Sequence, residues 1–322
     1  MMRRRQFLGL MTGAGAALVK RAYADSYPTR PVHVIVGFPP GAASDINSRL
    51  IGDWLSQRLG QQFVVDNRPG AGSNIAAEMA AHSAPDGYTL FTISPANAVN
   101  ATLYTNLSFD FVRDFAPVAG IMRTPLIMEI NPSLPIKTVG EFIAYAKANP
   151  GKLNFASSGN GTGSHVAAEL FKIMTGVDMT HVPYHGPAQA LTDLISGRVQ
   201  VMFDVLTSSM AHVRAGEVRA IAVTTESRSP ALPDVPTVGE TVSGYEASGW
   251  AALVAPKDTP ADAIATLNAA VNAGLAEPNI IAKLAALGGQ PFVATPAEIG
   301  KLMADETGKW AKVIKFANIK VE

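Results

Sequence analysis

The fold is indicated most directly by one stretch near the N-terminus, Val32-His33-Val34-Ile35-Val36-Gly37-Phe38-Pro39-Pro40-Gly41-Ala42-Ala43-Ser44-Asp45. Its first five residues are mostly β-branched and apolar, which predicts a buried strand. From Asp45 to Leu59 apolar residues recur at helical spacing. The loop between them consists mainly of small residues and prolines. A strand, such a loop and a helix in this order form the first unit of an α/β fold.

The same pattern continues outward from this stretch. Strands expected at 63–65 and 88–93 flank a helix at 74–81, and this β-α-β-α-β order is typical of a parallel sheet. A second α/β series begins after Pro125, and a proline-rich connection at 230–236 interrupts it. We therefore expect two doubly wound α/β lobes, one from 25–124 and 245–322 and the other from 125–244. Two crossings between lobes form a hinge that can close on a ligand.

Residues 1–24 have the features of an export signal. Three arginines (3–5) precede an apolar stretch at 7–19, and Ala22-Tyr23-Ala24 is a cleavage signal, so we expect cleavage after Ala24. Arg4-Arg5-Gln6-Phe7-Leu8 resembles the twin-arginine signal, although Arg3 replaces its usual Ser or Thr, which leaves the export route open. The alternative is a basic N-terminal helix of a cytoplasmic protein.

Composition excludes several classes of protein. The chain has no cysteine, which excludes disulfides, thiolate metal sites and the lipid-modified Cys that anchors many exported receptors. Without the five basic residues of the signal, 21 Lys and Arg face 26 Asp and Glu, so the remaining chain is mildly acidic. Such a charge balance does not indicate the basic surface that a nucleic-acid-binding protein needs. We expect a periplasmic protein that is not lipid-anchored.

Four loops that follow strands are the candidate ligand-binding loops, since ligands of open α/β sheets bind beyond the carboxyl ends of the strands. Small residues, hydroxyls and helix N-termini in these loops favour an anion. The candidates are Phe38, Gly41, Ala42, Ser44, Asp45, Ser94, Asn97, Ser157, Ser158, Gly159, Gly161, Thr162, His165 and Asp204. No Arg or Lys occurs in these loops, so backbone N–H groups and hydroxyls would hold the anion, which favours a small carboxylate. The alternative is that these residues only cap helices and fix their own loops, which applies to Asp204 at least as well as ligand contact.

The sequence contains no motif of an enzyme. It lacks G-x-S-x-G and H-E-x-x-H, and its histidines have no metal-ligand spacing, so we expect no metal and no cofactor. Ser164 stands where a dinucleotide fingerprint needs its third glycine. Ser157, His165 and Asp204 could form a triad, but no spacing supports one, and loop bracing is the safer role for His165. An exported α/β hydrolase remains the alternative function.

The chain resembles the Bug family, the receptors of tripartite tricarboxylate transporters, over essentially its whole length from Tyr27. The resemblance rests on blocks in the family's order, among them Tyr27-Pro28-Thr29-Arg30-Pro31, Phe38-Pro39-Pro40-Gly41, Val65-Asp66-Asn67-Arg68-Pro69-Gly70-Ala71-Gly72, Ala84-Pro85-Asp86-Gly87-Tyr88 and Val182-Pro183-Tyr184.

This resemblance implies a two-lobed Venus-flytrap fold of the type II periplasmic binding proteins. It also implies a monomeric receptor that binds a small carboxylate and serves the membrane permease subunits of such a transporter. The matching positions for ligand contact are Gly41, Asp45, Ser157, Gly159 and Asp204. A sensor that reports the ligand to a signalling membrane protein would share the fold.

Three positions depart from the family pattern. Ala42 replaces the second glycine of Gly-Gly, and because alanine tolerates positive φ poorly, we expect a reshaped loop. His185 stands where Lys or Arg is usual, and Gln189 where Pro is usual. These departures prevent a relative's ligand from being transferred to this chain.

Overall fold

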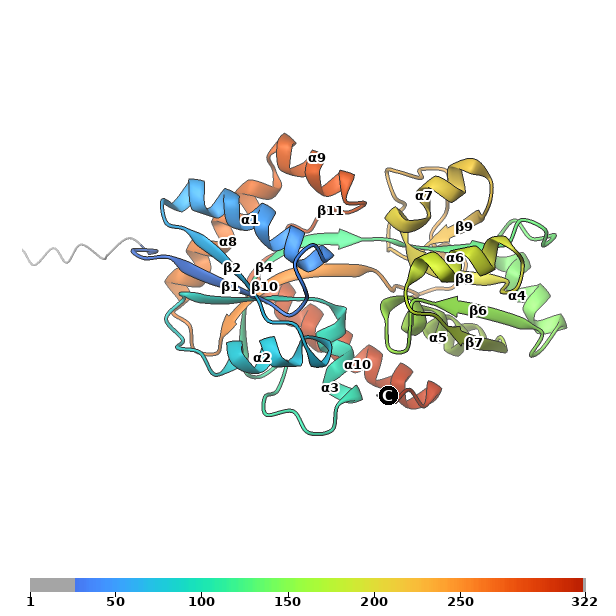
Figure 1. Ribbon diagram of the computed structural model, residues 1–322, viewed down its shortest axis with the longest axis horizontal. Coiled ribbons are helices and arrows are strands. Elements are labelled where there is room, and N and C mark those ends of the chain that lie inside the picture. The colour runs from blue at the N-terminus through green and yellow to red at the C-terminus, as the bar shows by residue number, and fades with distance from the viewer. Residues whose placement is uncertain (1–26, 321–322) are drawn as a thin grey trace, which may run out of the picture.

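The computed structural model describes residues 27–320, so the export signal expected at 1–24 lies outside the described range. Two lobes lie side by side, each built around its own sheet (Figure 1). Helices cover both faces of each sheet, which confirms the α/β class. In the described part of the chain, no helix combines the length and the apolar character needed to span a bilayer.

The first lobe contains a six-stranded sheet in the order β11-β4-β10-β3-β1-β2. Strands β1, β2 and β3 are parallel, as predicted, whereas β10 runs antiparallel to both β3 and β4 because it returns from the second lobe. The strand bounds are β1 Val32–Val36, β2 Phe63–Asn67, β3 Thr89–Ile93, β4 Phe115–Thr124, β10 Gly249–Pro256 and β11 Gln290–Pro291.

Two layers of helices enclose this sheet. Buried side chains of α1, α8 and α9 pack on one face, and those of α2, α3 and α10 pack on the other. The helix bounds are α1 Ala43–Leu59, α2 Asn74–Ala81, α3 Pro95–Leu103, α8 Ala261–Leu275, α9 Pro278–Ala286 and α10 Pro296–Ala317, with a 3₁₀ turn at Ala71–Ser73.

The second lobe contains a five-stranded sheet in the order β7-β6-β8-β5-β9. Its strands are β5 Leu126–Ile130, β6 Leu153–Ser157, β7 Met179–Pro183, β8 Val201–Val205 and β9 Arg219–Val223. Helices α4 (Val139–Ala148) and α5 (Gly163–Thr175) pack on one face, and α6 (Pro187–Ile195) and α7 (Leu206–Ala215) on the other.

The chain crosses between the two sheets at two places. Strand β4 leads directly into β5 through Pro125, and the return runs from β9 through a 3₁₀ turn at Val238–Glu240 into β10. The sequence did not indicate β4, because Pro117 and Gly120 interrupt its apolar pattern. In the structure β10 pairs with β4 across two register shifts, which accommodate these residues.

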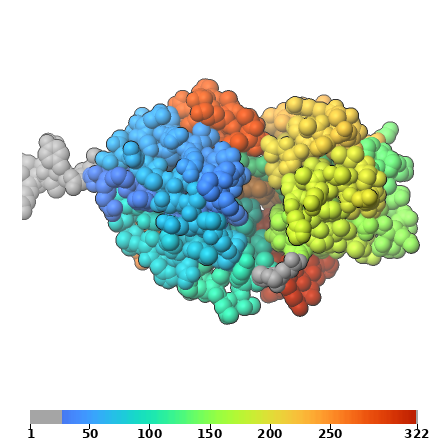
Figure 2. All heavy atoms as spheres, in the orientation of Figure 1, coloured from blue at the N-terminus to red at the C-terminus, as the bar shows by residue number. Residues whose placement is uncertain are grey.

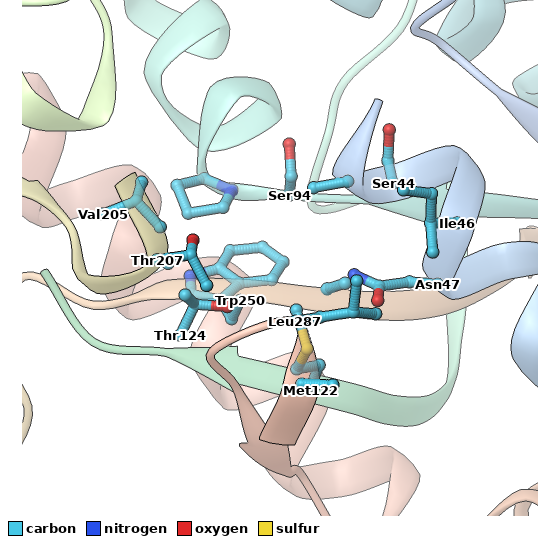
Figure 3. A pocket seen from close by; sticks show the side chains of 15 residues that line it. Ser44, Ile46, Asn47, Ser94, Met122, Thr124, Val205, Thr207, Trp250 and Leu287 are labelled. Atoms are coloured by element: carbon cyan, nitrogen blue, oxygen red, sulfur yellow. The ribbon is translucent and has the colours of Figure 1, made fainter. Parts of the chain in front are cut away.

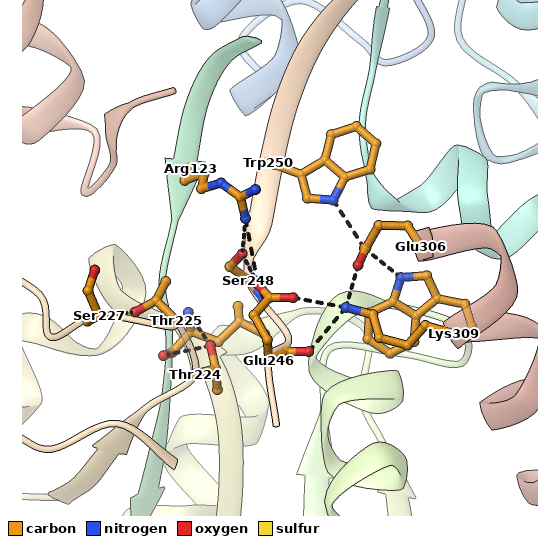
Figure 4. Close-up of polar contacts among 11 residues, drawn as sticks. Arg123, Thr224, Thr225, Ser227, Glu246, Ser248, Trp250, Glu306 and Lys309 are labelled. Carbon is orange, nitrogen blue, oxygen red and sulfur yellow. Dashed lines mark hydrogen bonds and ion pairs between the residues drawn. The ribbon is translucent and has the colours of Figure 1, made fainter. Parts of the chain in front are cut away.

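A polar network holds helix α10 against the second crossing (Figure 4). The Glu306 carboxylate accepts hydrogen bonds from the indole N–H groups of Trp250, at 3.1 Å, and of Trp310, at 2.8 Å. Lys309 forms ion pairs with Glu306 and with Glu246, which precedes β10. Helix α10 also contacts α5 of the second lobe, so it connects the two lobes on the side of the crossings.

Candidate functional site

A cavity of about 470 Å³ lies between the two lobes. The space-filling view shows the groove between the lobes in which they face each other (Figure 2). The cavity is lined by Ala43, Ser44, Ile46, Asn47, Ser94, Pro95, Met122, Thr124, Val205, Thr207, Gly249, Trp250, Ala251, Ala286 and Leu287 (Figure 3). These residues come from both lobes and from both crossing strands, so any movement of one lobe relative to the other changes the shape of the cavity.

Three helices begin at this cavity, namely α1, α3 and α7. The caps of α1 and α7, Ala42 and Val205, provide no side-chain hydrogen bond, so N–H groups of both first turns are available to a ligand. At α3, Asn97 accepts a hydrogen bond from the Ser94 N–H at 3.0 Å. Free N–H groups and the helix dipole favour an anion at this position.

None of the described residues that line the cavity is charged. Its polar groups are hydroxyls of serine and threonine and the amide of Asn47. The apolar part includes Trp250, Met122, Ile46 and Leu287. Because the Trp250 N–H donates to Glu306, the indole ring offers the cavity apolar surface. The site therefore combines donors for one anionic group with an apolar wall.

Asp45 braces the loop that precedes α1. It is buried, and its carboxylate accepts hydrogen bonds from the Gly41 N–H and from Asn67, both at 2.9 Å, and pairs with Arg49 at 2.9 Å. Burial opposes ionisation, but these contacts with Arg49, Gly41 and Asn67 hold the pKa of Asp45 below its ordinary value. Its side chain is thus engaged by the protein. Gly41 has a φ of 85°, whereas Ala42 has a φ of −68°, so the loop does not require a positive φ of Ala42.

The loop between β6 and α5 is held by its own hydrogen bonds and does not line the cavity. Ser157 lies 2.6 Å from His181 Nε2, and the Gly161 N–H donates to His165 Nδ1 at 3.0 Å. The His165 and His181 rings stack at 3.8 Å. Burial lowers the pKa of His165 to about 3 and that of His181 to about 4, so both are neutral at pH 7.

These contacts support the loop-bracing role of His165. They contradict a triad of Ser157, His165 and Asp204. Ser157 pairs with His181, not with His165. The other candidates of this loop bond one another as well: the Ser158 N–H donates to the Ser164 hydroxyl at 2.8 Å, and the Thr162 hydroxyl donates to the Gly159 carbonyl at 2.7 Å.

Asp204 is the penultimate residue of β8, inside the second lobe, and is 1% exposed. The Ser209 hydroxyl lies 3.3 Å from Asp204 Oδ2 and 2.8 Å from Glu129 Oε1, so a single hydroxyl is placed between two carboxyl groups. Burial raises the pKa of Asp204 to about 6, and burial together with the nearby Asp204 raises that of Glu129. Asp204 does not line the cavity.

Of the predicted site residues, Ser44 and Ser94 line the cavity. Phe38 is not part of the lining, and its carbonyl accepts a hydrogen bond from Asn67 at 3.0 Å. Sequence reasoning missed Asn47, although it lies one turn after Ser44 on the same helix, a spacing that could have identified it. It also missed Trp250 and the residues of β4 and α9, for which no local signal exists. Among the described residues, no group of acidic or histidine side chains could hold a metal ion.

Comparison with known proteins agrees with this geometry. The sequence model of the "Tripartite tricarboxylate transporter family receptor", TctC, matches residues 48–319. The chain is 36% identical to Protein BugT of Bordetella pertussis, over 96% of each protein. It is similar to the R. palustris protein Rpa4515 with adipate, with 39% identity and a TM-score of 0.73 over 91% of this chain and 99% of that one.

A TctC solute binding protein from Polaromonas, solved with no ligand, shares 26% identity and has a TM-score of 0.83 over 90% of this chain and 99% of that one. The predicted resemblance to the Bug proteins is confirmed, and with it the expected solute-binding fold. The chain belongs to the TctC family of tripartite tricarboxylate transporter receptors.

Proposed function

We propose that the protein captures a small carboxylate in the cavity between its lobes and delivers it to the membrane permease subunits of a tripartite tricarboxylate transporter. The observation that carries this proposal is the meeting of three helix N-termini at one cavity that no charged side chain of the described residues lines. Backbone N–H groups, hydroxyls and bridging waters can hold a carboxylate there without a buried counter-charge. The adipate in the similar R. palustris receptor supports this ligand class.

The lobes close on the ligand about the two crossings, which we place at the boundaries 124/125 and 244/245. Closure requires a ligand that binds the closed state more tightly than the open one. Residues from both lobes line the cavity, so a ligand there can contact both lobes at once, which supports closure.

The same proposal includes export to the periplasm, with the signal removed after Ala24, and a monomeric receptor that is not lipid-anchored. The basic and apolar pattern of residues 1–24 and the absence of cysteine support this location.

Binding by the mature chain tests the proposal. Residues 25–322 are titrated with a panel of small carboxylates by isothermal calorimetry and by thermal unfolding, and the matching primary amides serve as controls. A ligand at about 100 times its Kd adds about 2.7 kcal/mol of stability. Binding of carboxylates but not of their amides supports the proposal, whereas binding of neutral or cationic solutes alone refutes it.

A hydrolase is favoured by one observation, the 2.6 Å contact between Ser157 and His181. Ser157 is fully buried, however, and among the described residues no carboxylate hydrogen-bonds His181 to orient it. Hydrolysis of short-chain aryl esters that is lost in Ser157→Ala would establish this alternative. A sensor role is tested by growth on the ligand after deletion of the gene, because only uptake makes growth depend on the receptor.

A further inference from the structure

The Asn47 amide is the one polar side-chain group of the cavity lining that is both buried and unsatisfied among the described residues. Asn47 is 2% exposed, and its Oδ1 has no hydrogen-bond partner there. It follows Ser44 by one turn of α1, and Figure 3 shows its side chain extending from that helix into the cavity. Buried amide groups without a partner are rare in proteins, and each one calls for a missing partner such as a ligand.

The surroundings of Asn47 are apolar and uncharged. Met122, Trp250 and Leu287 line the same cavity. Two positively charged residues lie close in sequence to residues of the lining. Arg49 of α1 pairs with Asp45 at 2.9 Å, and Arg123 of β4 lies between Met122 and Thr124, which face the cavity. Alternation along a strand directs Arg123 to the opposite face, where it stacks on Phe292 at 4.3 Å and pairs with Glu246 at 3.8 Å.

The first carboxylate would occupy the helix N-termini, and a second one would meet no cationic side chain among the described residues of the lining, so its desolvation would be compensated less well. A neutral hydroxyl or amide has no such cost and can pair with Asn47 in either sense, because rotation of the amide exchanges its oxygen and nitrogen.

We infer that the ligand is a monocarboxylate whose apolar body packs against Trp250 and bears one uncharged hydrogen-bonding group that pairs with Asn47. This inference rests on the proposed function. The carboxylate would occupy the helix N-termini, and Asn47 would select among monocarboxylates by the substituent on their body. A site built to hydrogen-bond one polar group discriminates against the analogue that lacks it, because the protein group is then left unpaired.

The experiment measures Kd by calorimetry for a panel of probes: benzoate, its three hydroxy isomers, hexanoate, 6-hydroxyhexanoate, adipate and citrate. In the wild-type protein at least one hydroxylated probe should bind about tenfold more tightly than its unsubstituted parent, as expected for one hydrogen bond. Adipate and citrate should bind more weakly than the monocarboxylates.

Asn47→Leu should abolish this hydroxyl preference while the unsubstituted parents still bind. Asn272→Leu is the matched control, because Oδ1 of Asn272 is also buried without a partner but lies on α8, outside the cavity lining. It should keep the wild-type preference. Circular dichroism verifies folding, and Asn47→Ala replaces the leucine variant if that one does not fold.

Two results would overturn the inference while leaving the proposed function intact. One is a hydroxyl preference that is absent from the wild type or unchanged in the Asn47 variant, and the other is tighter binding of adipate or citrate than of every monocarboxylate. If no carboxylate binds at all, the proposed function fails as well.

Discussion

The buried acid pair of the second lobe makes a prediction about stability that can be worked from the structure. Asp204 on β8 faces Glu129 of β5, and the Ser209 hydroxyl lies between them. Burial raises the pKa of Asp204 from 3.8 to about 6. We predict that Asp204→Asn removes the part of the pH dependence of stability that Asp204 contributes in the interval between these two values.

The sign follows from proton binding. Between about pH 4 and pH 6 the folded chain keeps a proton on Asp204 that the unfolded chain has released, so stability falls as the pH rises and stays lower above pH 6. A difference of about two pKa units corresponds to about 3 kcal/mol. The variant avoids this penalty but loses about 1 kcal/mol in weaker hydrogen bonds. It should therefore be about 2 kcal/mol more stable than the wild type at pH 7.5 and slightly less stable at pH 4.

Urea unfolding followed by circular dichroism at pH 4, 5, 6 and 7.5 measures this difference. Glu129→Gln is the companion variant. Because burial raises the pKa of Asp204, the pH dependence that Asp204 contributes should persist in this variant. The reasoning is refuted if Asp204→Asn shows the same slope of stability against pH as the wild type, since the carboxyl would then be hydrated in the folded protein.

Three further predictions concern the lobe contacts, the α10 network and the stacked histidines. Gly288→Ala should weaken carboxylate binding at least tenfold without unfolding the protein. A Cβ atom added at Gly288 would lie 2.2 Å from Cγ2 of Thr207 in the other lobe, and Gly288 has a φ of 73°. Calorimetry measures the loss of affinity, and an unchanged affinity would contradict the reasoning. Glu306→Ala should cost about 2–5 kcal/mol in urea unfolding, because it leaves two indole N–H groups without their acceptor and removes one of the two carboxylates that pair with Lys309. A cost below about 1 kcal/mol would show that water replaces the carboxylate. Burial holds the folded pKa values of His165 and His181 below the unfolded value of 6.5, so their imidazole NMR signals should not titrate between pH 5 and pH 8. For the same reason the two rings should make the protein less stable as the pH falls from 6.5 toward 4. A titration midpoint near 6.5 for either ring would contradict their burial.

Much of the architecture was readable from local pattern. Apolar strands at 32–36, 63–65 and 88–93 and the helices that follow them form because side-chain periodicity and burial act within a few residues. Strand β4 could not be predicted from the sequence, because Pro117 and Gly120 interrupt its apolar pattern. Its pairing with β10 also joins residues more than a hundred positions apart. The antiparallel direction of β10 likewise depends on where the chain returns from the second lobe.

The sequence by itself determined the fold class and the family, because these depend on residue types and on their order along the chain. Only the tertiary structure decided which loop residues face the cavity between the lobes. Ser44 and Ser94 face it, whereas Ser157 and Asp204 turn to partners on other strands and helices, which no local pattern announces. The apolar wall at Trp250 was equally invisible, because it is brought to the N-termini of α1 and α3 by a crossing strand from the far end of the chain.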